Sequence, residues 1–590
     1  MAKIKVFQSN VSAESFKSKC YSEIKFFNTF LDYQALDVYH YQPLKTLLKT
    51  NVENLFVNDI YQDYGINNYN GSLAYGEVQS GKTSNMLCST IFAYDYGFKY
   101  VFIFTGNITA LHNQTINRFG KEFSNFRKYC ENNYQNNQEL KYARDKEISF
   151  YPAINIRDIR ELEITVSFVE QLEKNNDLNV FFVLKNTSSY EKVVRILELS
   201  GNLKKRNSIL ILDDESDWGF KSGSYLDNSP KLFNDLSEIK KICETKDYYL
   251  KYIAFTATPY KIFESSQSFI NNINNVVRLQ SKQFQDWMTN DYVETNDPFY
   301  CGINVFHPSH KVNYKSEVIE NLINRGFVSI INNEVNEQQL LILSLLTFLI
   351  NSYAYKITTG KFGMKKNLYG LYFSDVVQSK HDKDFSNLVN LLPILNKVME
   401  EKVFPQFKSV DYRTWNQSKI DFILFFLEIM VGVIPLQLSA FKDIIIAKLS
   451  QFSYSQVNSI FLYIHSWIKA AIKDKNALIV KMSGNEEDGA KFDQKQPLGE
   501  LNSIFIIGGY KISRGITFDN LVFECITKKS DKNDSTLQRA RWFGYRSLDL
   551  LKNMTIILSE EVNKSFEESI RNDVNWREAI ETYQKDLHHN

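Results

Sequence analysis

The sequence lacks a surplus of charge of either sign. It contains 69 lysine and arginine residues against 68 aspartate and glutamate residues, which gives a net charge of +1 at pH 7. This balance produces no overall electrostatic attraction to nucleic acid, so a polyanion has to bind to a local patch of positive charge. The short basic clusters at 204–206 and 365–366 are better explained as solvated surface than as such a patch.

Closely spaced cysteines are also absent. The six cysteines are scattered along the chain, without the spacing of a zinc site or of a redox pair. We therefore expect reduced cysteines and no structural metal ion. The composition, with 44% hydrophobic and 14% aromatic residues, is sufficient for a large core without disulfide bonds.

The apolar runs are too short to cross a membrane. The runs at 340–350 and 422–435 fall below the roughly 20 residues that a membrane helix needs, which predicts buried helices instead. The first residues also lack the apolar segment of a secretory signal. We expect a cytoplasmic protein without membrane contact.

Short apolar segments alternate with helical patterns from residue 72 onward. The apolar segments include SLAY, YVFIF, VFFVL, SILIL and YIAF, and the stretches between them are long enough for helices. Strands and helices that alternate in this way predict an α/β fold with parallel, doubly wound sheets. A chain of 590 residues is also too long for a single core, so we expect more than one domain.

A glycine-rich loop follows the first of these strands. Its sequence, GEVQSGKT at 76–83, fits the pattern G-x-x-x-x-G-K-[ST], and a helical stretch follows it. Glycines allow the backbone to curl so that its N–H groups and the helix N-terminus face phosphate oxygens. The loop predicts bound ATP, with Lys82 on the β and γ phosphates and Thr83 on Mg²⁺; the alternative is a glycine-rich turn that arose by chance. The residues expected to bind the nucleotide are Gly76, Gln79, Ser80, Gly81, Lys82 and Thr83.

Acidic residues follow another apolar strand, where SILIL at 208–212 leads into DDESD at 213–217. The carboxyl ends of parallel strands are where folds of this class bind their ligands. Asp214 can hold the Mg²⁺ that Thr83 also contacts, and Glu215 can orient or deprotonate the attacking water. A solvated acidic turn is the alternative for this segment alone, but the upstream phosphate loop favours the catalytic interpretation.

Three later segments add weaker indications. TATP at 256–259 follows a strand and is suited to sensing the nucleotide, and GGYKISRGITF at 508–518 also follows a strand. In LQRARWFGYR at 537–546, Arg541 and Arg546 are candidates for arginines that contact the γ phosphate during its transfer. A basic surface helix with Trp542 and Phe543 packed inward is the alternative for this last segment.

Together, the segments VQSGKTSNM, DDES, TATP, GGYKISRGITF and QRARWFGYR resemble the motif series of the Z1 domain family, from about Gly76 to Arg546. Members of this family resemble superfamily 2 helicases and occur in bacterial restriction-like and phage-defence gene clusters, often beside a GHKL-type ATPase and candidate nucleases. The resemblance implies two RecA-like lobes that use ATP and Mg²⁺. The last motif departs from the helicase form Q-x-x-G-R-x-x-R, because Arg541 lies three rather than four residues after Gln538. The choice of γ-phosphate arginine between Arg541 and Arg546 therefore stays open.

The resemblance also implies a role for each matching residue and a division of the chain. Lys82 and Thr83 contact nucleotide and Mg²⁺, Asp214 holds Mg²⁺, and Glu215 acts in hydrolysis. On the second lobe, the residues implied at the ATP site are Arg514, Gly515, Gln538, Arg541 and Arg546. The expected parts are a helical N-terminal segment (1–65), a first RecA-like lobe (66–275), a linker or cap (276–335), a second RecA-like lobe (336–560) with a helical insertion at about 385–475, and a C-terminal tail (561–590).

The function expected from these residues is that of an ATP-dependent, helicase-like DNA translocase or remodeller in a bacterial anti-phage system. Double-stranded DNA is expected on family resemblance alone, and a GHKL-type ATPase or a nuclease is the expected protein partner. Two alternatives stay open. The triplets at 139–141 and 238–240 have the form E-x-K of some nucleases, although neither follows a convincing strand. An ATP-gated scaffold that switches the assembly of partners is the second alternative.

Overall fold

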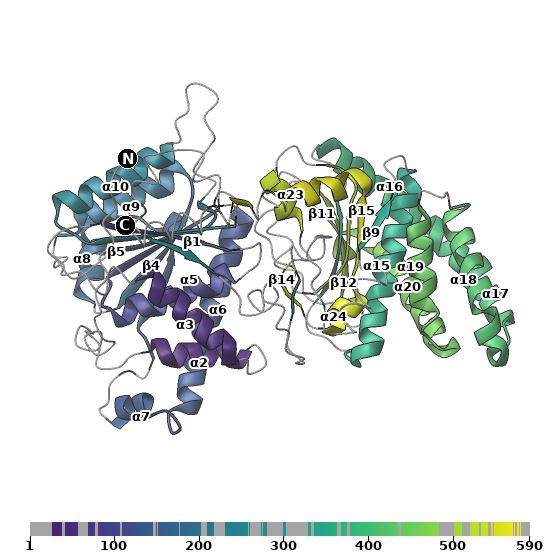
Figure 1. Ribbon diagram of the computed structural model, residues 1–590, viewed down its shortest axis with the longest axis horizontal. Coiled ribbons are helices and arrows are strands. Elements are labelled where there is room, and N and C mark those ends of the chain that lie inside the picture. The colour runs from purple at the N-terminus through teal and green to yellow at the C-terminus, as the bar shows by residue number, and fades with distance from the viewer. Residues whose placement is uncertain are drawn as a thin grey trace. The chain divides into compact units, whose positions relative to one another are not determined.

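The computed structural model of the chain divides into two compact units (Figure 1). Unit 1 consists of residues 1–285 and 573–590, and unit 2 consists of residues 286–572. The structure describes residues 26–37, 42–56, 69–76, 81–106, 109–145, 149, 151–175, 177–201, 209–216, 231–257, 259, 273, 275–279, 299–301, 328–331, 336–362, 367–373, 378–434, 438–482, 501–509, 518, 520–529, 533–540, 544–546, 548–569, 572, 575–576 and 579.

Unit 1 is built on a seven-stranded sheet in the order β3-β4-β2-β5-β6-β1-β7, and all neighbouring strands are parallel. The inner strands are apolar runs such as VFFVL in β4, and their residues are buried, as expected for parallel strands covered on both faces. The predicted parallel, doubly wound sheet is confirmed. The strands are β1 Tyr69–Tyr75, β2 Tyr100–Thr105, β3 Ile154–Asp158, β4 Leu178–Leu184, β5 Ile209–Asp213, β6 Leu250–Thr256 and β7 Asn275–Arg278.

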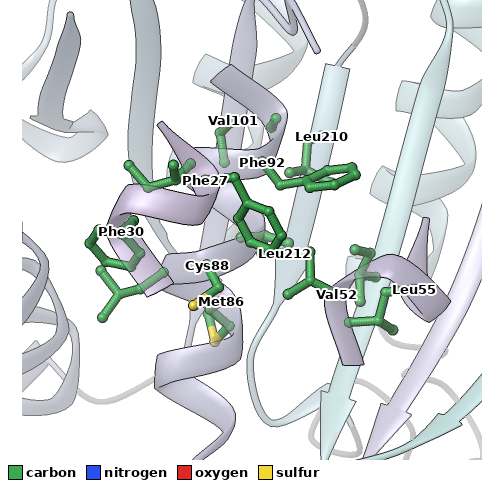
Figure 2. Close-up of a cluster of buried hydrophobic side chains, with 14 of the residues drawn as sticks. Phe27, Phe30, Val52, Leu55, Met86, Cys88, Phe92, Val101, Leu210 and Leu212 are labelled. Atoms are coloured by element: carbon green, nitrogen blue, oxygen red, sulfur yellow. The ribbon is translucent and has the colours of Figure 1, made fainter. Parts of the chain in front are cut away.

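Side chains alternate between the two faces of this sheet and form two separate cores. In β5, Leu210 and Leu212 belong to one core, whereas Ile209 and Ile211 belong to the other. Figure 2 shows the first core, where Phe92 lies among residues of two N-terminal helices and of the strands. Helices α2, α3, α5, α6 and α7 contribute to the first core, and α8, α9 and α10 to the second. Their bounds are α2 Phe27–Asp37, α3 Gln42–Leu55, α5 Lys82–Asp95, α6 Thr109–Asn133, α7 Gln138–Asp145, α8 Val166–Lys174, α9 Thr187–Leu199 and α10 Lys231–Thr245, with a 3-10 turn at Ile159–Glu161.

Helix α2 is attached to α5 by a buried carboxylate. Asp95, at the end of α5, accepts hydrogen bonds from the backbone N–H groups of Phe26 (2.9 Å) and Phe27 (2.8 Å). These N–H groups start α2 and have no partner within the helix, so Asp95 serves as their cap. The predicted helical N-terminal segment is therefore an integral part of the first core.

Unit 2 contains a six-stranded sheet in the order β11-β12-β10-β13-β15-β9, again with parallel neighbours throughout. A short antiparallel pair, β8 with β14, forms a separate ribbon. The second parallel sheet that the sequence predicted is confirmed. The strands are β8 Phe299–Cys301, β9 Val328–Ile331, β10 Leu368–Phe373, β11 Ile479–Met482, β12 Ser503–Gly508, β13 Leu521–Ile526, β14 Gly544–Arg546 and β15 Thr555–Ser559.

A long helical insertion separates β10 from β11, as predicted. Helix α20 is joined to the sheet at Ser503, whose carbonyl accepts a hydrogen bond from Trp467 Nε1 (2.8 Å) and whose hydroxyl contacts the Tyr463 hydroxyl (2.6 Å). In Figure 1, α15, α19 and α20 lie nearer to this sheet than α17 and α18 do. The bounds are α15 Glu337–Thr359, α16 Gln378–Val398, α17 Phe404–Ser409, α18 Trp415–Val431, α19 Ser439–Leu449, α20 Tyr454–Lys473, α21 Lys475–Leu478, α23 Asn533–Arg539 and α24 Leu548–Asn553, with a π-helical turn at Met399–Val403 and a 3-10 turn at Tyr412–Thr414.

The apolar run at 340–350 lies in α15, as predicted, whereas the run at 422–435 lies in α18 only up to Val431, and Val433 beyond the helix is exposed. Among the described residues, α15 alone is long and apolar enough to span a membrane, and 89% of its most apolar window is buried inside the protein. It packs against strands β10, β12, β13 and β15, which makes it the central helix of unit 2.

Three expectations about regular structure need correction. The segment 276–335, expected to be a linker or cap, contains most of β7 together with β8 and β9, and β9 extends the second sheet. The strand β10 lies in the second lobe at a position where the sequence predicted no strand. Residues 560–569, placed mostly in a polar tail, are helical, and Val562 and Phe566 are buried.

A close approach between Gly370 and Phe348 leads to a stability prediction. A Cβ atom at Gly370, in β10, would lie 2.4 Å from the Phe348 ring of α15. Both residues lie inside unit 2, so the helix and the strand cannot separate easily. We expect Gly370→Ala to lower the free energy of unfolding by roughly 1–3 kcal/mol, and a second change, Phe348→Leu, to recover part of this loss.

Thermal unfolding of the full chain tests this prediction. Gly120→Ala is the control, because Gly120 lies inside α6 with no atom within 4 Å of a Cβ, and alanine favours a helix there. A melting temperature for Gly370→Ala equal to that of the wild type would contradict the close contact.

Candidate nucleotide site

The phosphate loop and the acidic segment begin at the same edge of the first sheet. β1 ends before the phosphate loop and β5 ends at Asp213, with β6 between them. The pairing of β1 with β6 continues into the loop, because Gly76 N donates to Thr256 O at 3.1 Å. Since all three strands are parallel, their carboxyl ends and the residues that follow them meet at one edge.

The end of the phosphate loop has the backbone conformation that its glycine predicts. Gly81 adopts a left-handed conformation, with φ of 88°, and helix α5 begins at the next residue, Lys82. Asn85 fixes this start, since its backbone N and its side-chain Nδ2 both donate to Gly81 O at 3.1 Å. Lys82 and Thr83 therefore occupy the first turn of α5. The predicted residues Gln79 and Ser80 lie outside the described residues.

The acidic segment forms a tight turn directly after β5. Asp214 N donates to Phe104 O (2.8 Å), and Asp214 Oδ1 accepts a hydrogen bond from Glu215 N (3.1 Å). Glu215 has a φ of 50°, a left-handed conformation that is uncommon for a residue with a side chain. The hydroxyl of Ser216 donates to Phe255 O in β6 at 3.2 Å. Thus the turn is attached to both strands that flank β5.

Electrostatic effects connect Lys82 of the loop with Asp214 of the turn. Burial raises the pKa of the Asp214 carboxyl, and the positive charges of Lys82 and Lys185 act in the opposite direction. Lys82 is therefore close enough to influence the ionisation of Asp214. The fold thus brings together the two residues that the sequence assigned to phosphate and to metal.

Lys185, which follows β4 directly, is a residue of this site that the sequence did not predict. Its Nζ forms an ion pair with Asp213 Oδ1 at 2.6 Å, and the two side chains are only 3% and 4% exposed. The other Asp213 oxygen accepts a hydrogen bond from the Tyr252 hydroxyl at 2.6 Å. Burial, followed by the Asp213 charge, raises the pKa of Tyr252 well above its ordinary value. The only indication in the sequence is a lysine placed directly after an apolar strand.

These residues suit the ligands that the sequence predicted. A lysine and a helix N-terminus are typical of phosphate sites. Thr83 and Asp214 carry oxygen ligands of the kind that Mg²⁺ prefers. Burial raises the pKa of the Asp214 carboxyl, and a divalent cation beside it would lower that pKa again. The charge of Asp213, by contrast, is already balanced by Lys185. The described residues are therefore compatible with ATP and Mg²⁺.

A second polar cluster lies farther along the same sheet edge. Thr105, at the end of β2, contacts His112 Nδ1 at 2.7 Å, and His112 Nε2 lies 3.1 Å from Asp158 at the end of β3. Arg160 donates to Asp158 Oδ2 (2.6 Å) and to Asn113 (2.8 Å). Burial lowers the pKa of His112 despite the Asp158 charge. At Asp158, the bonds from Arg160 and His112 outweigh the effect of burial and lower the pKa.

The predicted residues of the second lobe are described only in part. Gln538, near the end of α23, is 6% exposed, and its Oε1 has no hydrogen-bond partner among the described residues. Arg546 lies in β14, where its backbone pairs with Phe299, while its side chain is outside the described part. Arg514, Gly515 and Arg541 also lie outside the described residues.

Comparison with protein families identifies one part of the chain. Residues 435–589 match the family model described as "Z1 domain". This segment of the chain is similar to the Z1 domain. The match includes Gln538, Arg541 and Arg546, whereas Lys82 and Glu215 lie before it. The predicted resemblance is therefore confirmed in the segment that contains the late arginines.

Comparison with solved structures found helicase chains of low similarity. One is "S. cerevisiae Dbp5 bound to RNA and ADP BeF3", with a TM-score of 0.35 and 9% identity over 88% of this chain and 89% of that chain. Another is "Structure of Mycobacterium smegmatis helicase Lhr bound to ssDNA and AMP-PNP", with a TM-score of 0.36 and 10% identity over 83% of this chain. The aligned part spans 44% of the Lhr chain. No curated protein matched the sequence.

The Asp158 cluster leads to a pH-dependent prediction. Because the folded-state pKa of Asp158 is lowered, the ionised carboxyl contributes stability above its unfolded-state pKa of about 3.9. This contribution is lost as the pH falls through the folded-state value. We expect Asp158→Asn to cost roughly 1–3 kcal/mol at pH 7 and progressively less below about pH 4.

Melting temperatures between pH 3 and pH 7 measure this effect. Glu163→Gln, at an exposed position of the same unit, is the control and should match the wild type throughout. A difference between Asp158→Asn and the wild type that stays constant with pH would contradict a stabilising carboxylate at this position.

Proposed function

We propose that this chain is a Mg²⁺-dependent ATPase of the helicase type. The observation that carries the proposal is the meeting of Lys82 and Thr83, in the first turn of α5, with Asp214 and Glu215 at one sheet edge. The influence of Lys82 on the ionisation of Asp214 supports it further. Residues of these types in this arrangement are those that bind and hydrolyse a nucleoside triphosphate.

Each residue has a definite role in the proposal. Lys82 and the N–H groups at the start of α5 bind the β and γ phosphates. Thr83 and Asp214 supply oxygen atoms to Mg²⁺, which neutralises the charge that develops on the phosphate oxygens. Glu215 orients the attacking water or accepts its proton. Tyr252 and Lys185 hold Asp213 inside the protein, which leaves Asp214 as the carboxylate for the metal.

The proposal extends to a motor that acts on DNA. The motif series and the Z1 match support a DNA translocase or remodeller in a bacterial anti-phage or restriction-like system, with double-stranded DNA as the substrate. The same resemblance, rather than geometry, supports a role for Arg514, Gly515, Gln538, Arg541 and Arg546 at the nucleotide. A GHKL-type ATPase or a nuclease is the proposed partner, and the cytoplasm is the proposed compartment.

Steady-state ATP hydrolysis by the full chain tests this function. It is measured without nucleic acid and with duplex DNA, single-stranded DNA or RNA. We expect duplex DNA to raise the rate, and Lys82→Ala and Glu215→Gln to lower kcat by at least roughly 100-fold, because each removes a group that acts in phosphoryl transfer. Lys246→Met is the control. Lys246 donates to the Ser200 carbonyl at 2.7 Å, and the two residues precede β6 and β5, so this contact lies at the edge of the sheet opposite to the proposed site.

The other outcomes distinguish the alternatives. A Lys82-dependent rate that no nucleic acid raises would favour the ATP-gated scaffold, and stimulation by RNA alone would replace DNA as the substrate. DNA cleavage that persists in Lys82→Ala would indicate a nuclease. Absence of ATP hydrolysis in the wild type under all conditions, with or without Mg²⁺, would contradict the proposed enzyme.

A further inference from the structure

The side chain of Lys185 makes three contacts with consecutive residues of the acidic turn. Its Nζ lies 2.6 Å from Asp213 Oδ1, and it donates to the carbonyl oxygens of Asp214 (2.5 Å) and Glu215 (3.0 Å). The first contact is an ion pair, and the other two are hydrogen bonds to backbone carbonyl groups. Lys185 follows β4, which pairs with β2, and β2 in turn pairs with β5. The lysine therefore reaches the turn across one intervening strand.

The two carbonyl contacts coincide with an unfavourable backbone conformation. Glu215 has a φ of 50°, and a non-glycine residue in this region costs of the order of 1 kcal/mol, so surrounding contacts must maintain it. Lys185 binds the carbonyl groups of Asp214 and Glu215, which belong to the two peptide groups on either side of the Glu215 Cα. Together with the bond from Glu215 N to Asp214 Oδ1, these contacts fix the backbone on both sides of Glu215.

A counter-ion for Asp213 would not need this arrangement. A buried carboxylate requires a positive charge or donors, and the ion pair together with the Tyr252 hydroxyl already meets that need. The donations to Asp214 O and Glu215 O add nothing to the neutralisation of Asp213. They act on the residues that the proposed function assigns to metal binding and to hydrolysis.

We propose that Lys185 is a positioning residue that holds Asp214 and Glu215 in their catalytic arrangement. It acts through backbone carbonyl groups and does not touch the nucleotide. This inference rests on the proposed function for its consequence in catalysis, but the restraint on the turn is a property of the protein without ligand. The two parts can therefore be tested separately.

The experiment separates the role of Lys185 as a counter-ion from its role in the turn. Lys185→Met removes the charge and all donors. Lys185→Met with Asp213→Asn also removes the buried carboxylate, and Tyr252 can still donate to the amide oxygen. Lys185→Arg keeps the charge and several donors, so it should recover part of the activity. Asp213→Asn alone and Lys246→Met are the controls.

Three quantities are measured on the full chain: the melting temperature, kcat and KM for ATP, and amide hydrogen exchange of the 213–216 peptide without nucleotide. We expect Lys185→Met to lower the melting temperature and to lower kcat roughly 10- to 100-fold, with KM changed less than about threefold. The double variant should regain the melting temperature but not kcat. Its 213–216 peptide should exchange at least roughly tenfold faster than in Asp213→Asn.

Recovery of kcat in the double variant to the level of Asp213→Asn would overturn the proposal, because Lys185 would then be a counter-ion only. Unchanged exchange at 213–216 in the double variant would overturn it as well. If the wild type does not hydrolyse ATP, the proposed function fails, and the exchange measurement still decides whether Lys185 restrains the turn.

Discussion

The site of unit 1 depends on the parallel pairing of β1, β6 and β5. Because β6 lies between the other two strands, the phosphate loop and the acidic turn are separated by two inter-strand spacings, or roughly 10 Å. Hydrogen bonds extend the pairing beyond the strands, from Gly76 N to Thr256 O and from Asp214 N to Phe104 O. The backbone of the sheet therefore determines where both functional segments begin.

Burial on both faces of the sheet means that each polar side chain in it needs a partner. Strands β2, β4 and β5 are fully buried, and the carboxylates of Asp213 and Asp158 lie where their strands end. Two clusters meet this requirement at the carboxyl edge. Lys185 and Tyr252 satisfy Asp213, whereas Arg160 and His112 satisfy Asp158. At Asp214, burial raises the pKa despite two nearby lysines.

The sequence predicted those parts that depend on local pattern. Continuous apolar runs indicated β2, β4, β5 and β6, and the glycine-rich motif indicated the loop that precedes α5. It did not reveal β3, whose residues are only partly buried, or β10, whose Gly370 is explained only by the distant Phe348. Lys185 was missed because its partners lie about 30 residues away and meet it only through the strand order. The roles of Arg541 and Arg546 stay predictions.

Equilibrium binding of ATP decides whether this sheet edge is a nucleotide site. It is measured on the full-length Glu215→Gln variant, in which bound ATP should persist, with and without Mg²⁺ and beside a variant that also carries Lys82→Ala. The account predicts saturable binding of a single nucleotide that Mg²⁺ strengthens and that the loss of Lys82 abolishes. Absent binding, or an affinity unchanged by Lys82→Ala, would contradict it.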